Sequence, residues 1–365
     1  MNNYPFYFNE DKLENVKTYK YLGIMLSTSG TFDIAKQELK KIALKALLSL
    51  RENMKEHFRT DITLTTKLFD ALIKPILLYA SEIWGVDYNQ KNIDKDPLEQ
   101  INIKFCKMLL VVSKSATNAA CRAELGQLPL KCEATYRATK YWKKMISSEK
   151  YSLPIIAYED LEKRNIAKSW YGKMQNIISQ IGFRQVWLNK NKTSNLDLAL
   201  YNIKQRLKDI EIQTWSSEIN NDTRTEKNHR NKLRSYRQFK TNFKREDYLV
   251  HIPIVKHRTA MTKLRISNHC LEIERGRYAR PYKKVEQRLC PSCPNKVEDE
   301  LHFTLQCKTY ERNRNILLES MKEITNSDLS GISEKSLFLK IMNPPPKLCK
   351  IAAKFIYDCF KLREY

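Results

Sequence analysis

Four residues near the end of the chain have the types and the spacing of a metal site. Cys290 and Cys293 form a C-x2-C pair, and His302 and Cys307 follow after eight and four intervening residues. Zinc favours four thiolate or imidazole ligands in a tetrahedron, and a tight turn lets both thiolates of such a pair point at one ion. The spacing predicts a structural zinc site. The alternative is three buried thiols and an unrelated surface histidine.

The local sequence indicates how these ligands are positioned. Pro291 and Pro294 suit a tight turn around the cysteine pair, and Asp299 can cap a short helix that carries His302. Residues five apart on an α-helix point about 140° away from each other. The helix is therefore expected to loosen or end before Cys307. Four protein ligands leave no open coordination position, so we expect no catalysis at the metal.

The charge of the chain predicts a polyanionic partner. Lys and Arg number 65 against 41 acidic residues, a net charge of +24, and nucleic acid is the usual partner of such an excess. The alternative is a scattered, solvated positive surface. The charge is concentrated in two runs, residues 224–245 and 256–288.

Basic side chains in these runs are the candidate phosphate contacts of RNA or DNA. They are Arg224, Lys227, Arg230, Lys232, Arg234, Arg237, Lys240, Lys244, Arg245, Lys256, Arg258, Lys263, Arg265, Arg275, Arg277 and Arg280. The interleaved Tyr236, Phe239 and Phe243 could stack on bases. Together with Leu233, their spacing of three and four instead favours the buried side of a helix.

Several classes of protein are not indicated by the sequence. The N-terminus lacks a secretory signal, and the most apolar stretch, residues 68–84, is too short and too charged to span a bilayer. That stretch predicts a buried helix broken near Pro75. No Asp-Asp pair, phosphate-binding loop or hydrolase motif occurs. We therefore expect an intracellular nucleic-acid-binding chain that has neither a membrane partner nor a small-molecule substrate.

The pattern of apolar residues predicts a mainly α fold with a small N-terminal β hairpin or meander and a zinc-stabilised module near the C-terminus. Short aromatic stretches at 5–8 and 19–26 indicate strands, with breaks after each. Helical spacing follows at 32–50, 61–84, 97–112 and 348–360. The expected segments are 1–30 (β element), 31–150 (helical), 151–222 (helical linker), 223–288 (basic), 289–312 (zinc) and 313–365 (C-terminal helices).

Five stretches resemble, in this order, the C-terminal part of reverse transcriptases from animal non-LTR (LINE-type) retrotransposons. The most specific are the pair "YKYLG" and "LLYASEIWG" and the cysteine-histidine block. The resemblance runs from about Tyr4 to Arg314, through residues 19–32, 68–85, 104–130, 232–243 and 275–307.

The resemblance implies roles for particular residues. Tyr21, Leu22 and Gly23 match a strand that acts as a primer grip, the helices after it match a thumb, and the cysteine-histidine block matches a zinc segment that contacts nucleic acid. The family's palm, with its metal-binding aspartates, would precede the grip and has no counterpart here. We therefore expect no polymerase activity from this chain alone, Mg²⁺ only where a palm is supplied, and a nuclear location. The alternative is a domesticated zinc-containing scaffold that binds proteins.

Overall fold

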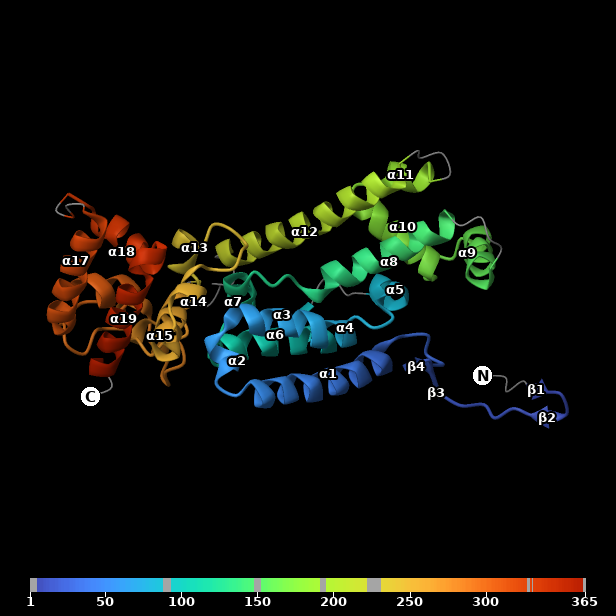
Figure 1. Ribbon diagram of the computed structural model, residues 1–365, viewed down its shortest axis with the longest axis horizontal. Coiled ribbons are helices and arrows are strands. Elements are labelled where there is room, and N and C mark those ends of the chain that lie inside the picture. The colour runs from blue at the N-terminus through green and yellow to red at the C-terminus, as the bar shows by residue number, and fades with distance from the viewer. Residues whose placement is uncertain are drawn as a thin grey trace. The chain divides into compact units, whose positions relative to one another are not determined.

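The computed structural model confirms the predicted fold class: it is mainly helical, with two small hairpins at the N-terminal end (Figure 1). It describes residues 5–87, 93–147, 152–190, 195–221, 231–326, 329 and 331–363. None of the helices in this described part combines the length and the apolar character that a membrane span requires.

The chain forms two compact units, and each unit combines segments that are distant in sequence. The first unit contains residues 1–50, 68–101 and 130–207, and the second contains residues 51–67, 102–129 and 208–365. The six consecutive segments expected from the sequence remain a prediction.

The N-terminal strands pair as two antiparallel hairpins, β1 (Tyr7–Phe8) with β2 (Asp11–Lys12) and β3 (Thr18–Tyr21) with β4 (Ile24–Ser27). The predicted hairpin is thus present, but the second turn lies within residues 19–26 and not after them. Leu22 and Gly23, at φ +47° and +84°, form this turn. Glycine adopts positive φ without steric cost, which explains why the chain reverses here.

The helices of the N-terminal half of the chain follow the predicted stripes. Ala35, Leu39, Ala43 and Leu47 are buried along α1. The elements are α1 (Asp33–Met54), α2 (His57–Thr60), α3 (Ile62–Leu68), the π-turn η1 (Phe69–Ile73), α4 (Lys74–Leu77), α5 (Ser81–Trp84), the 3-10 turns η2 (Gly85–Asp87) and η3 (Ile93–Lys95), α6 (Pro97–Leu110), α7 (Asn118–Leu125), α8 (Leu130–Ile146) and α9 (Leu153–Arg164). The break expected near Pro75 takes the form of η1 followed by α4, in which Pro75 lies in the first turn.

The C-terminal half contains the remaining helical elements. They are α10 (Trp170–Gln180), α11 (Arg184–Leu188), α12 (Leu196–Asn220), α13 (Tyr236–Phe239), α14 (Tyr248–His251), α15 (Val255–Arg265), α16 (Glu272–Arg275), η5 (Val285–Gln287), the π-turn η6 (His302–Gln306), η7 (Lys308–Tyr310), α17 (Glu311–Thr325), α18 (Glu334–Met342), η8 (Pro346–Leu348) and α19 (Cys349–Arg363).

Aromatic residues dominate one core of the first unit. The ring of Trp142, on α8, stacks on that of Trp187, on α11, at 5.2 Å between centroids. The ammonium group of Lys190 lies 5.1 to 5.3 Å from the rings of Trp187, Tyr158 and Tyr171. Cation–π contacts of this kind let a lysine end inside an otherwise apolar cluster.

In the second unit, α19 packs against α15 and α17 (Figure 1). Ala352, Phe355, Ile356 and Cys359 form its buried stripe, as the sequence predicts. The helix expected along residues 233–243 is in contrast limited to α13. Leu233, Tyr236 and Phe239 are buried, which confirms their assignment to the core.

Candidate metal centre

Two backbone motifs of the second unit present the four predicted ligands. Cys290 and Cys293 lie on a small hairpin, closed by hydrogen bonds from Cys290 N to Lys296 O (2.8 Å) and from Glu298 N to Arg288 O (2.9 Å). Asn295, at φ +60°, completes the turn, and asparagine is one of the few residues that accepts this conformation readily. The turn therefore holds both thiols on the same side.

The other two ligands come from η6, a π-turn. Cys307 N donates a hydrogen bond to His302 O (2.8 Å), which is the i to i+5 bond that defines such a turn. Cys307 itself is extended, and the Asp299 carboxylate accepts from His302 N at 2.8 Å. The predicted loosening before Cys307 and the predicted cap are both confirmed.

The four ligand atoms converge at metal-site distances. They all lie within 4.8 Å of one another. Cys307 Sγ is 3.9 Å from Cys290 Sγ and 3.8 Å from Cys293 Sγ. Zinc–sulfur bonds of about 2.3 Å in a tetrahedron require sulfurs about 3.8 Å apart. The cluster could therefore hold one metal ion without rearrangement.

The environment of the ligands also fits a cation. Neither ring nitrogen of His302 has a hydrogen-bond partner among the described residues, although both are buried. Burial lowers the pKa of His302, which favours the neutral imidazole that binds metals. Burial raises the pKa of Cys290 to about 12, whereas the backbone N–H of Lys308 lowers that of Cys293. A bound cation would favour the thiolate form of these cysteines.

A buried carboxylate next to η6 interacts with side chains of both basic runs. Glu300 accepts hydrogen bonds from Arg234 Nη2 (2.6 Å) and Ser235 Oγ (2.9 Å), and its Oε1 lies 3.0 Å from His269 Nε2. Burial opposes ionisation of Glu300, but Arg234 and His269 outweigh it and lower its pKa well below the ordinary value. Ion pairing thus fixes the position of the segment that carries His302.

A second carboxylate ties the hairpin to α19. Glu298 accepts from Arg363 Nε (2.9 Å) and Nη2 (2.7 Å) and from the backbone N–H of Glu272 (2.6 Å). Glu298 and Glu300 were not among the residues predicted from the sequence. Their position beside the helix cap was visible in the sequence, but their partners are distant along the chain.

The structure narrows the set of candidate phosphate contacts. Lys240, Arg258 and Arg265 are buried, and they donate to carboxylates or carbonyls inside the protein. Their assignment as phosphate contacts is corrected, because a side chain engaged in the interior does not face a ligand in solution.

The other described candidates are at least partly accessible. Lys244, Lys256, Arg275 and Arg280 are exposed. Those that are half-buried are Lys232, Arg234, Arg237, Arg245, Lys263 and Arg277. Arg234 and Arg277 form ion pairs with Glu274. Arg224, Lys227 and Arg230 lie outside the described residues.

The candidate primer-grip residues form the exposed β3–β4 turn in the first unit. Leu22 is 74% exposed, and its carbonyl accepts a hydrogen bond from Tyr79 Oη at 2.7 Å. The two stretches that carry the family resemblance most specifically, "YKYLG" and "LLYASEIWG", therefore meet in space. The role of Tyr21, Leu22 and Gly23 remains a prediction.

The chain matches no family model, no curated protein and no solved structure.

Proposed function

We propose that this chain is the nucleic-acid-binding part of a non-LTR (LINE-type) retrotransposon reverse transcriptase, which holds template RNA or primer DNA. The proposal rests on the order of the five resembling stretches and on the positive charge. In this reading the family's catalytic palm, and the Mg²⁺ that it binds, belong to another part of the polymerase.

One observation carries the proposal: the excess of positive charge does not lie in the buried interior. Seven acidic and six basic side chains are buried among the described residues, so the charges inside nearly cancel. The net charge of +24 is therefore available to a polyanion at the surface. Nucleic acid gains affinity from such a surface by releasing its counterions.

We propose zinc as the ion of the cysteine-histidine cluster. Three sulfur donors and one imidazole are a donor set that zinc favours. Four protein ligands saturate a tetrahedral ion, so the role would be structural, holding the hairpin against η6. We expect about one zinc ion per chain by mass spectrometry of the purified protein. Cys290→Ser should lose the zinc and Cys270→Ser should retain it; zinc well below one per chain in the wild type would contradict the assignment.

The cellular location follows from the same proposal. Elements of this family act on chromosomal target sites, so we place the chain in the nucleus. Imaging of a tagged chain in a host cell tests this, and a protein excluded from the nucleus would contradict it.

A protein-interaction module is the second candidate function. Apolar side chains of the N-terminal hairpins are exposed, among them Phe6, Tyr7, Phe8 and Tyr19. Exposed apolar patches frequently mark protein contacts. In this case the chain would bind a protein and would show no salt-sensitive affinity for RNA.

The dependence of affinity on salt distinguishes the two functions. Fluorescence anisotropy of a labelled structured RNA should give submicromolar affinity at low salt. On single-stranded RNA, log K should fall with log salt by about 0.7 per phosphate contact. A flat dependence would contradict nucleic-acid binding and favour the interaction module.

Primer extension tests the expected division of labour. The isolated chain, supplied with primer, template, deoxynucleotides and Mg²⁺, should synthesise no DNA. Clear synthesis would show that a catalytic centre exists in this chain, and the proposal would have to be replaced.

A further inference from the structure

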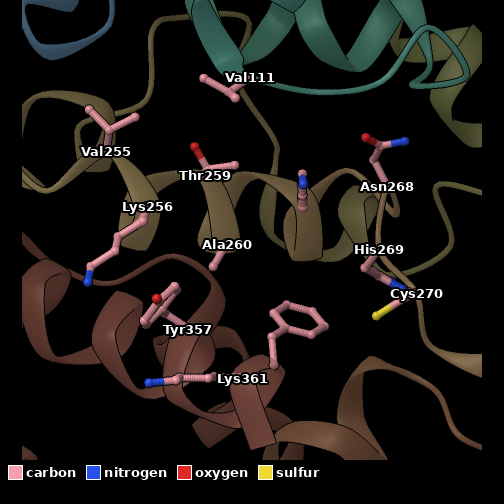
Figure 2. Close-up of a pocket in the computed structure, with 12 residues that line it drawn as sticks. Val111, Val255, Lys256, Thr259, Ala260, Asn268, His269, Cys270, Tyr357 and Lys361 are labelled. Atoms are coloured by element: carbon pink, nitrogen blue, oxygen red, sulfur yellow. The ribbon is translucent and has the colours of Figure 1, made fainter. Parts of the chain in front are cut away.

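A cavity of about 680 Å³ lies between α15 and α19 in the second unit (Figure 2). Its wall is completed by Val111, at the end of α6, and by residues 268–270, which follow α15. The volume is in the range of sites for small organic ligands, roughly 300 to 1,000 Å³.

Three lysines give the cavity a positive potential. Lys256 and Lys263 come from α15 and Lys361 comes from α19. None of the described residues that line the cavity is acidic. Like charges repel one another unless an anion lies between them, so the lining is complementary to an anionic group.

Aromatic and aliphatic side chains form the rest of the wall. Tyr357 lines it from α19, and Val255 and Ala260 line it from α15 (Figure 2). Phe360 also lines it from α19. The ammonium group of Lys256 lies 5.0 Å from the centre of the Tyr357 ring, which places charge beside an aromatic face. Such a wall suits a planar, aromatic group.

The wall is fixed before any ligand binds. Asn268 accepts from Ser113 N (3.0 Å) and donates to Ser113 Oγ (2.8 Å). His269 is held by Glu300, and the Phe360 ring stacks on Phe303 at 4.7 Å. Because Glu300 and Phe303 flank the metal ligand His302, the metal-binding segment supports one side of the cavity.

We propose that this cavity binds one unpaired nucleotide of a single-stranded RNA or DNA. The base lies against Tyr357, Phe360 and the aliphatic wall, and the phosphate lies between Lys256, Lys263 and Lys361. A phosphate ion alone would leave the apolar wall in contact with water. A neutral apolar ligand would leave the three ammonium groups without an anionic partner. The inference rests on the proposed nucleic-acid function and assigns it a specific site.

Photocrosslinking locates the base directly. The full chain is mixed with an oligouridylate that carries one 5-iodouridine, irradiated with near-ultraviolet light, and digested for mass spectrometry. The expected adduct is on Tyr357 or Phe360. Excess uridine 5′-monophosphate should suppress it. Adducts confined to residues that do not line the cavity would overturn the proposal.

Matched variants provide the second measurement. Tyr357→Leu removes the ring but keeps the apolar volume, and it should weaken oligouridylate binding roughly fivefold to 100-fold. Lys361→Gln should weaken it, whereas Lys350→Gln, an exposed residue of the same helix outside the cavity, should not. If all three variants bind the oligouridylate with the affinity of the wild type, the proposal is overturned. Circular dichroism identifies a variant that has lost its fold.

The result separates this inference from the function on which it rests. If the wild type binds RNA in a salt-sensitive manner but shows no adduct and no loss in the variants, only the cavity assignment fails. If it binds no nucleic acid at all, the proposed function fails and the cavity assignment fails with it.

Discussion

Two opposite faces of α15 both carry positively charged side chains, but one face is buried in the protein and the other lines the cavity. Arg258 and Arg265 lie on one face and are 4% and 0% exposed. Lys256 and Lys263 lie on the other face and line the cavity. Both pairs are seven residues apart, so each pair occupies one side of the helix. Basic composition alone therefore does not identify a ligand-binding surface.

The buried face uses arginine because a guanidinium group can satisfy several partners at once. Arg265 donates to both oxygens of Glu124 at 3.0 Å and to Glu246 Oε2 at 2.6 Å. The rings of Phe239 and Tyr248 lie 4.7 and 4.9 Å from it. The open face uses lysine, whose compact charge remains available to an anion.

Loss of the buried arginine should have the largest effect. Arg265→Met leaves Glu124 and Glu246 without their shared partner in the interior, and breaking a buried ion pair in this way costs about 3–5 kcal/mol. The measurement is the shift of the urea or thermal unfolding midpoint relative to the wild type.

Lys256→Met is the matched control on the open face. It removes an exposed charge and one cation–π contact, so the loss should be about 1 kcal/mol or less. Similar losses in the two variants would show that the distinction between the faces is wrong.

The buried face should also make the protein sensitive to acid. Burial opposes ionisation of Glu124, but Arg265 and Lys240 outweigh it and lower its pKa below the ordinary 4.5. A lowered carboxyl pKa contributes stability that is complete above pH 4.5 and is lost as the pH falls through the folded-state value.

Unfolding midpoints measured from pH 7 down to pH 3 check this dependence. Glu124→Gln should be less stable at pH 7, and its stability should fall less steeply in acid than that of the wild type. Both proteins carry the same cysteine-histidine cluster, so any effect of acid on that cluster is common to both. It therefore cancels in the difference between the two stability profiles. Parallel profiles would contradict the assigned role of Glu124.

The smallest effect is expected from the open face. Lys256→Met should make the dependence of log K on log salt shallower by about 0.7 for single-stranded RNA, the value of one phosphate contact. Lys350→Met, at an exposed lysine of α19 outside the cavity, should leave the salt dependence unchanged. An unchanged salt dependence in Lys256→Met would remove this lysine from the binding surface.

The metal cluster could be predicted from the sequence because its residues are local. Cys290 and Cys307 are the two ends of a single short segment. The types of the four residues and their spacing were therefore sufficient to predict the cluster. The prediction that the helix loosens or ends before Cys307 followed from the angle between residues five apart. The helical stripes, such as that of α19, were predictable for the same reason.

Features that depend on distant segments were not predictable. The burial of Arg265 depends on Glu124, which lies far away in the chain. The cavity depends on α19 meeting α15, so Tyr357 and Lys361 had no visible link to Lys256. The turn at Leu22 was missed because a stretch rich in aromatic and aliphatic residues resembles one strand, although Gly23 was a signal for a hairpin turn.

The π-turn η6 has a consequence for how the metal motif tolerates insertions and deletions. The i to i+5 bond from Cys307 N to His302 O accommodates one more residue than an α-turn would. Deleting one residue between His302 and Cys307 would leave the pair four apart, on the same face of an ordinary helix. Two motif lengths are therefore compatible with the same ligand geometry. For an ion held by both His302 and Cys307, the local helix type would matter more than the residue count.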